Sequence, residues 1–182
     1  AASSDYPLRD VYKRQSLSLS AASLDVFTRQ LSAMQAMLGK LAAHCEAKKI
    51  DPAAFLNARL YPDMFAFTRQ VQIACDFAKM AGARLSGQEP PSHPDTETTI
   101  AELQERCGKV IAYLASLDRA TVDAAGDREI TFRTGPDSSM TLPGGAYLTG
   151  FILPNVYFHL TAAYAILRHN GLEIGKRDFM GI

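Results

Sequence analysis

Apolar residues recur at alternating intervals of three and four positions in four long stretches of the chain. On an α-helix this spacing puts the apolar side chains on one stripe, which has to be buried against another element. Four such helices can bury their stripes against one another, as in a four-helix bundle. The pattern therefore predicts an all-α four-helix bundle, with apolar stripes over Leu24–Cys45, Met64–Leu85, Ile100–Leu117 and Leu148–His169. The first helix is expected to start near Ser18 or Ser20 and to end near Lys49.

Prolines and glycines set the expected path between the second and third helices. The second helix should begin after Pro62 and close at Gly87, and Asp95 or Thr96 should cap the third. The segment Gln88–Pro94 contains three prolines and should be extended. With its flanks it can reach about 30 Å at about 3.3–3.6 Å per residue. It can thus span the length of a bundle and leave the second and third helices parallel.

The period changes to alternation after the third helix. Glu129–Phe132 and Met140–Leu142 alternate apolar and polar residues around a turn at Gly135–Ser138. This pattern predicts a short β-hairpin between the third and fourth helices. The side chains expected to face the bundle are those of Ile130, Phe132, Met140 and Leu142.

The fourth helix is expected to follow Gly144-Gly145 and to stop at Asn170-Gly171. Pro154 lies inside it and should bend it, because proline removes one backbone hydrogen bond.

Composition narrows the functional classes. The chain has 182 residues, enough for one domain, and a formal net charge of zero. Without a basic excess we expect no nucleic-acid partner and no anionic membrane partner. We also expect no membrane-spanning segment. Three cysteines without a CxxC pair, Cys45, Cys75 and Cys107, are typical of buried thiols in a reducing cytoplasm.

The first residues look different from the rest of the chain. The string from Asp5 to Gln15 looks like a translated sequencing adapter and has neither helical period nor strand alternation. We therefore expect residues 1–15 to be a disordered artefact and residues 16–182 to form the single domain.

Polar groups interrupt the apolar stripe of the fourth helix. His159 lies between Ile152 and Ile166 in a column that should be buried, one helical turn after Asn155. A buried neutral histidine needs partners for its ring nitrogens or binds a metal. Two interpretations stay open: a core histidine satisfied by Asn155, a tyrosine or a backbone carbonyl, or a ligand.

Other candidate site residues come from three further segments. Gln70 flanks the stripe of the second helix and can line a pocket, whereas Asp76 points away and should be a surface charge. His44 and His169 lie near helix C-termini, where the helix dipole favours them. If the second and third helices are parallel, these two histidines lie toward one end of the bundle together with His93.

Several blocks carry a resemblance to a known family. They include Asn57–Leu60, Arg69–Ala74, Asp76–Lys79, Asp95–Thr99, Tyr157–His159 and Gly175–Phe179. In these blocks the chain resembles a bacterial domain of unknown function (DUF1993), which is grouped with the DinB and YfiT-like metalloenzymes. The resemblance extends over residues 16–182.

The resemblance implies an up-down-down-up four-helix bundle that is often dimeric. In better-studied relatives three histidines hold a divalent metal, one from the second helix and two from an HxxxH pair on the fourth, and members include thiol-dependent transferases. Here His159 matches one half of that pair, Ala163 stands four residues further on, and residues 62–85 contain no histidine. Since zinc and similar ions need at least three protein ligands, we expect no bound metal and no other cofactor.

Two functional hypotheses follow. The first is a bundle that binds a small molecule or pairs with itself as a homodimer and keeps a degenerate metal site. The alternative is a metal-dependent transferase or hydrolase using a pocket centred on His159. The sequence leaves open whether the protein is an enzyme.

Overall fold

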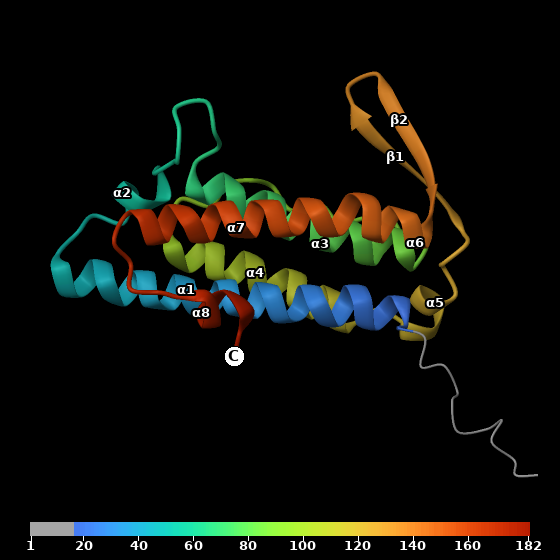
Figure 1. Cartoon of the computed structure of the whole chain (residues 1–182), viewed down its shortest axis with the longest axis horizontal. Coiled ribbons are helices and arrows are strands. Elements are labelled where there is room, and N and C mark those ends of the chain that lie inside the picture. The colour runs from blue at the N-terminus through green and yellow to red at the C-terminus, as the bar shows by residue number, and fades with distance from the viewer. Residues whose placement is uncertain (1–16) are drawn as a thin grey trace, which may run out of the picture.

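The structure, a computed structural model, describes residues 17–182, so the expectation for residues 1–15 lies outside the described part. The protein is mostly helical, with one small antiparallel sheet of two strands (Figure 1). Its long helices are α1 (Val26–Lys48), α3 (Phe67–Leu85), α4 (Ile100–Ala115) and α7 (Leu153–His169). The shorter elements are π-helical η1 (Ala21–Asp25) and η2 (Tyr147–Ile152), helices α2 (Ala53–Leu56), α5 (Arg119–Asp123), α6 (Gly144–Ala146) and α8 (Lys176–Met180), and strands β1 (Glu129–Gly135) and β2 (Ser138–Pro143).

The four long helices lie side by side. The chain colours of Figure 1 show α1 and α7 starting at the end that carries the hairpin, and α3 and α4 running toward that end. Helix α1 packs on α4, and α3 packs on both α4 and α7. The extended segment after Gly87 therefore returns the chain along the molecule before α4 begins.

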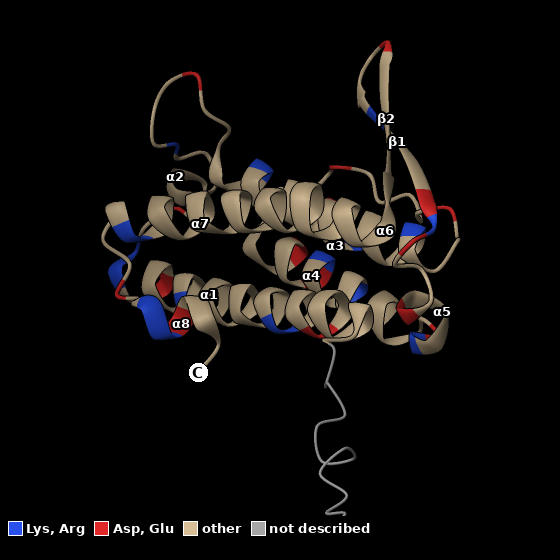
Figure 2. Cartoon of the chain, turned by 45° about the vertical axis from the view of Figure 1, so that its right-hand side comes forward, with Lys and Arg blue, Asp and Glu red and all other residues tan. Residues whose placement is uncertain are grey.

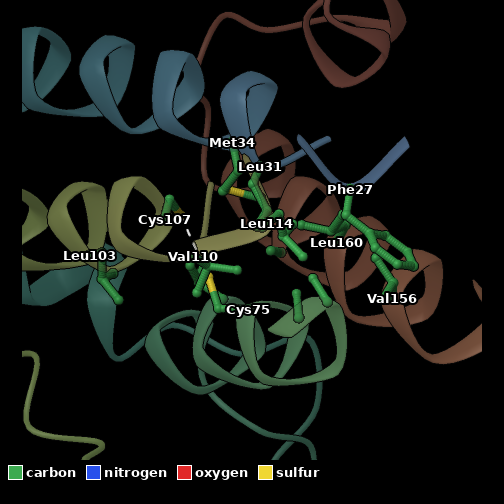
Figure 3. Close-up of a cluster of buried hydrophobic side chains, with 14 of the residues drawn as sticks. Phe27, Leu31, Met34, Cys75, Leu103, Cys107, Val110, Leu114, Val156 and Leu160 are labelled. Carbon is green, nitrogen blue, oxygen red and sulfur yellow. Dashed lines mark hydrogen bonds between the residues drawn. The ribbon is translucent and has the colours of Figure 1, made fainter. Parts of the chain in front are cut away.

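The apolar faces of the four long helices meet in one core, but on α7 this face is not the predicted stripe, which runs through Phe158 and leaves that side chain 59% exposed. Figure 3 shows Phe27 and Leu31 of α1, Val110 of α4 and Val156 and Leu160 of α7 meeting in one buried cluster. All five side chains are almost completely removed from solvent. Burying a large apolar side chain contributes roughly 1.5–3 kcal/mol, so these stripes supply the main drive for folding.

Helix α3 begins later than the sequence predicts, at Phe67 instead of just after Pro62. The intervening residues fold back as a loop, and the N–H of Phe67 donates to the carbonyl of Ala58 over 2.9 Å. Ala66 is extended and caps the helix without a side-chain hydrogen bond. The apolar spacing predicted a helix over these residues, but the hydrogen bond between Phe67 and Ala58 holds them in a loop instead.

Helix α4 also begins later than predicted, because Thr99 is its N-cap instead of Asp95 or Thr96. The Thr99 hydroxyl accepts from the N–H of Glu102, and the Glu102 carboxylate accepts from the N–H of Thr99. This reciprocal capping box stabilises the helix start. Asp95 is used elsewhere, in ion pairs with Arg69 and Arg106.

The hairpin forms as predicted, with Ile130 opposite Leu142 and Phe132 opposite Met140. The predicted inward face is correct for Ile130 and Phe132, which are buried. It is wrong for Met140, which is 45% exposed, because the hairpin projects away from the helices (Figure 1). Leu142, the remaining predicted residue, is half-buried and packs against the core.

The last long helical stretch is continuous from Gly144 to His169 but changes its winding before the proline. Residues Tyr147–Ile152 form a π-helix, and Pro154 follows as the second residue of α7. By length and composition this stretch is apolar enough to cross a membrane, which departs from our expectation; core helices of soluble proteins meet the same criterion. Only 44% of its most apolar window is buried in the structure.

Candidate functional site

His159 of α7 and Gln70 of α3 face each other across the interface between the two helices. Nδ1 of His159 lies 2.7 Å from Oε1 of Gln70, and His159 is only 8% exposed. The same amide of Gln70 donates from Nε2 to the carbonyl oxygen of Phe65 over 3.2 Å. The loop before α3, the helix itself and α7 are thereby joined through one side chain.

This pair of contacts fixes where the imidazole carries its proton. The amide nitrogen of Gln70 has to face the Phe65 carbonyl, since an oxygen there would have no hydrogen to share. Oε1 of Gln70 therefore faces His159, and because it can only accept, Nδ1 is the protonated ring nitrogen. In the neutral imidazole Nε2 then carries a lone pair.

Aromatic rings hold the imidazole from two sides. Phe77 of α3 stacks on it with ring centroids 5.9 Å apart and planes 15° apart. Phe158 meets it edge-on at 5.2 Å. Burial, followed by the positive charge of Arg69, lowers the pKa of His159 below its ordinary value. The ring is therefore neutral at neutral pH.

The second ring nitrogen of His159 remains free. Within residues 17–182 the fully buried side-chain polar atoms without a partner are Nδ1 of His93 and Nε of Arg106. Nε2 of His159 makes no hydrogen bond and is not one of them, so it reaches the molecular surface. The structure thus presents an oriented lone pair at the protein surface.

An apolar groove, which we call the α7 groove, lies along the helix that carries this histidine, and His159 itself is not one of its lining residues. The groove has a volume of about 410 Å³ and runs between α7 and the loop before α3. Its lining residues are Leu60, Met64, Pro154, Tyr157, Phe158, Thr161, Ala162 and Ala165. Phe158 belongs to both features, because it lines the groove and contacts the His159 ring.

The surface around the α7 groove is unusually apolar. Phe158 is 59% exposed, and Tyr61 and Phe65 of the neighbouring loop are exposed by 65% and 56%. Residues 144–167 contain no Asp, Glu, Lys or Arg, so α7 is tan in Figure 2 except at Arg168 in its last turn, while the other long helices carry charges. Large exposed apolar patches of this kind mark binding surfaces.

The other predicted site residues lie away from this pair or serve their own helix. Asn155 donates to the carbonyl oxygen of Phe151 over 2.7 Å, in the turn before Pro154, so it is not the partner that the structure gives His159. His44 is half-buried and packs edge-on against Phe55 at 5.6 Å. His169 is exposed in the last turn of α7. Of the five candidates, the structure brings Gln70 and His159 together.

The donor set does not fit the metal that the DinB resemblance implies. His159 offers one nitrogen, and the amide oxygen of Gln70 is already engaged with Nδ1 of that ring. Throughout the described range 17–182, no three His, Cys, Asp or Glu side chains are grouped so that they could hold an ion. A structural or catalytic zinc site needs at least three protein ligands.

A buried charge network on the other side of α3 was missed by the sequence analysis. Arg106 of α4 is only 2% exposed, and its guanidinium pairs with Asp76 at 2.9 Å, Asp95 at 2.9 Å and Glu97 at 3.0 Å. Asp76 also pairs with the buried Lys79 at 2.9 Å, so the prediction of a simple surface charge at Asp76 is wrong. The network fastens the proline-containing segment to α3 and α4.

The network lowers the pKa of one of its acids, Glu97. Burial alone would raise the pKa of Glu97, but hydrogen bonds from Arg106 and Gln72 outweigh it and hold that pKa below its ordinary value. The carboxylate therefore stays ionised at neutral pH. No short sequence motif predicts the burial of Arg106. The only indication in the sequence is that Arg106 is next to Cys107, which lies on the apolar stripe.

The chain is similar to a known protein family and to a known crystal structure. The family model described as "Domain of unknown function (DUF1993)" matches residues 19–180. The chain belongs to this DUF1993 family. It is also similar to a crystal structure of a DinB family member protein from Shewanella denitrificans, with 41% sequence identity and a TM-score of 0.83.

That similarity covers 90% of this chain and 92% of the Shewanella protein. The resemblance to both the DUF1993 and the DinB families is thus confirmed. The comparison with curated proteins gives no match. Neither the DUF1993 description nor the name of the Shewanella structure states an activity.

Proposed function

We propose that this DUF1993 protein is a DinB-like, up-down-down-up four-helix bundle that binds a small apolar molecule in the α7 groove. His159 and Gln70 act as its polar anchor. The observation that carries the proposal is the contact of 2.7 Å between Nδ1 of His159 and Oε1 of Gln70. It fixes the imidazole so that Nε2 is the free ring nitrogen, on a helix that also lines an apolar groove.

The form of the groove supports a binding role. Small-molecule sites are concave and mostly apolar, with a few convergent polar groups that orient the ligand. The α7 groove is walled by aliphatic and aromatic side chains, and its volume of about 410 Å³ lies within the usual range for such sites. Nothing in the donor set replaces the metal of the better-studied relatives, so we favour binding over metal-dependent transfer or hydrolysis.

A second candidate, self-association as a homodimer, rests on a different observation. Tyr61, Phe65 and Phe158 are large aromatic residues exposed on neighbouring elements. A second copy of the chain is a natural cover for such a surface, because most soluble oligomers are symmetric pairs using the same patch twice. It would cover the α7 groove as well, so dimerisation and ligand binding would compete or cooperate.

We place this function in the cytoplasm, with neither nucleic acid nor membrane as partner. Cys45, Cys75 and Cys107 are free and buried, as expected of thiols kept reduced. The formal net charge of zero gives no general attraction for polyanions.

Titration with the neutral fluorescent probe Prodan (6-propionyl-2-dimethylaminonaphthalene) tests the proposal. We expect saturable binding to the wild-type chain with a blue shift of emission, weakened at least fivefold in Phe158→Ser. Met180→Ser is the matched control, since Met180 is 40% exposed on α8 and does not line the groove. Equal binding by all three proteins would reject the α7 groove as the site.

Two further measurements separate the alternatives. Metal analysis of the protein purified without a histidine tag tests the enzyme hypothesis; stoichiometric metal that disappears in His159→Ala would support it and overturn our preference. Analytical ultracentrifugation of the wild type and of Phe158→Ser tests the dimer. A dimer that dissociates in the variant would show that the same face pairs two copies.

A further inference from the structure

We propose that the molecule bound in the α7 groove is a neutral, largely apolar compound with a hydroxyl group, an alcohol or phenol, which donates its hydrogen to Nε2 of His159. This inference rests on the proposed function and specifies the class of ligand. It follows from the hydrogen-bond inventory of the site and from the charges around it.

The hydrogen bond available at Nε2 of His159 has only one direction. Gln70 has its amide oriented by the Phe65 carbonyl, and its Oε1 takes the Nδ1 proton of His159. The exposed Nε2 is consequently an acceptor. A ligand group that only accepts, such as an ether, a ketone or a carboxylate, has no hydrogen to give it.

The surroundings of Nε2 disfavour charged ligands. The guanidinium of Arg69 is close enough to lower the pKa of His159, so a cation at Nε2 would be repelled by the same charge. An anion at Nε2 would find no hydrogen to accept, because the neutral ring presents a lone pair there. An anion would also require a protonated imidazole, which burial against Phe77 disfavours.

The lining of the α7 groove favours a ligand with an apolar body. The α7 groove is lined by aliphatic and aromatic carbon, with the hydroxyls of Tyr157 and Thr161 as its only side-chain polar groups. Phe158 stands between the groove and the imidazole with its ring edge-on to His159. In the proposed complex a flat or slender apolar body lies along α7 and extends past Phe158, so that its terminal hydroxyl reaches Nε2.

The hydroxyl should contribute a modest and measurable share of the affinity. A neutral hydrogen bond that replaces one made with water contributes roughly 0.5–1.5 kcal/mol, which corresponds to about 3- to 10-fold in Kd. Most of the affinity would come from burial of the apolar body. A matched pair of probes that differ only in the donor can isolate this factor.

The test uses 2-naphthol, 2-methoxynaphthalene and 2-naphthoate as competitors of Prodan at pH 7.5. We expect 2-naphthol to bind about 3- to 10-fold more tightly than its methyl ether, and 2-naphthoate to bind most weakly. In His159→Phe, which keeps an aromatic ring against Phe77, the preference for the naphthol over the ether should vanish. His169→Phe is the control at the exposed end of α7 and should keep the preference.

Gln70→Glu provides an independent readout. A carboxylate facing Nδ1 favours the imidazolium form, so Nε2 becomes a donor and the order of the ligands should shift toward 2-naphthoate. Circular dichroism confirms that each variant is folded before the titrations are compared.

The possible failures are distinguishable. If the naphthol and its ether bind equally to the wild type and both lose affinity in Phe158→Ser, the groove binds apolar molecules but the hydroxyl inference is wrong. If neither probe binds, or if binding is unaffected by Phe158→Ser, the proposed function itself fails. A naphthol preference that survives in His159→Phe would assign the hydroxyl to another acceptor and overturn the inference.

Discussion

Gln70 and His159 are 89 positions apart in the sequence, and their side chains meet at 2.7 Å inside the interface of α3 and α7. Since Gln70 is also tied to the Phe65 carbonyl, the loop that borders the α7 groove and the imidazole beside it are held by one amide. The geometry of the groove and the protonation of His159 are therefore expected to depend on each other.

The free energy of unfolding should decrease as the pH is lowered, and His159 should account for part of this decrease. Burial and then Arg69 lower the pKa of His159 in the folded chain, whereas the unfolded chain titrates near the ordinary value of about 6.5. As the pH falls, the unfolded chain therefore takes up a proton on His159 before the folded chain does. The contribution of the neutral His159 to the free energy of unfolding is thus complete above about pH 6.5 and is lost as pH falls below this value. Urea denaturation at pH 8 and pH 5.5 should show a larger loss for the wild type than for His159→Phe.

His93 contributes in the same direction and remains in both proteins, so it serves as an internal reference. Burial, followed by the charges of Lys79 and Arg106, lowers the pKa of His93. A loss of stability that is identical in the wild type and in His159→Phe would show that His159 is not the neutral, buried group described here.

Removal of Arg106 should destabilise the fold strongly. Arg106→Met leaves Asp76, Asp95 and Glu97 facing one another without their shared cation. Breaking a buried ion pair typically costs about 3–5 kcal/mol, and the lower end, about 3 kcal/mol, applies here because Asp76 and Asp95 keep contact with solvent. Urea denaturation at pH 7 measures the difference.

Arg119→Ala is the matched control for that variant. Arg119 makes a two-pronged ion pair with Asp25, but both side chains are about half exposed. Exposed pairs contribute little, so this variant should unfold almost like the wild type. If both arginine variants are equally stable, the network around Arg106 does not hold the proline-containing segment as described.

The thiols should be protected in the native protein. Sγ of Cys75 lies 3.7 Å from Sγ of Cys107, and both side chains are fully buried between α3 and α4 (Figure 3). The hydrogen bond between the thiols and their burial raise the pKa of Cys75 well above its ordinary value, so the reactive thiolate is scarce. Ellman's reagent should react very slowly with the folded chain and with three thiols after denaturation in urea. Rapid reaction of the native protein would contradict this burial.

Gly144 should tolerate no side chain. A Cβ there would lie 2.1 Å from the carbonyl oxygen of Ala125, so Gly144→Ala has to displace backbone where the hairpin meets α6. We expect a loss of about 1–3 kcal/mol, as for an overpacked interior site. Gly150→Ala is the control, because a Cβ at that helical position meets nothing within 4 Å. It should leave the stability equal or raise it by about 0.5–1 kcal/mol.

Thermal melts of both glycine variants compare the two positions directly. A Gly144→Ala protein as stable as Gly150→Ala would mean that the junction of hairpin and helix is looser than the structure indicates.

The helices could be predicted from the sequence because each has a local cause. A stripe such as that through Phe27 and Leu31 is a property of one segment, and so is the hairpin with Ile130 and Phe132 on one side. The start of α4 could also be predicted locally, because Thr99 and Glu102 have the spacing of a capping box. Asp95 was an equally good cap locally, and only its pairing with Arg106 excludes it.

The candidate site was less predictable because its parts meet only in the folded chain. His159 and Gln70 were both candidates, yet nothing local indicated that Gln70, and not Asn155, would face the imidazole. The exposure of Phe158 was equally hidden, because an aromatic residue on an apolar helix is usually covered. Arg106 gave no signal, since three acids from two other segments have to converge before its burial becomes possible.

The tautomer of His159 tests the central claim most directly. A long-range ¹H–¹⁵N correlation spectrum of the folded protein at pH 7.5, assigned with His159→Phe, reports which ring nitrogen carries the proton. The contact with Gln70 predicts a protonated Nδ1 and an unprotonated Nε2 with the shift of a free lone pair. A spectrum with the proton on Nε2, or with both nitrogens protonated at this pH, would contradict the claim.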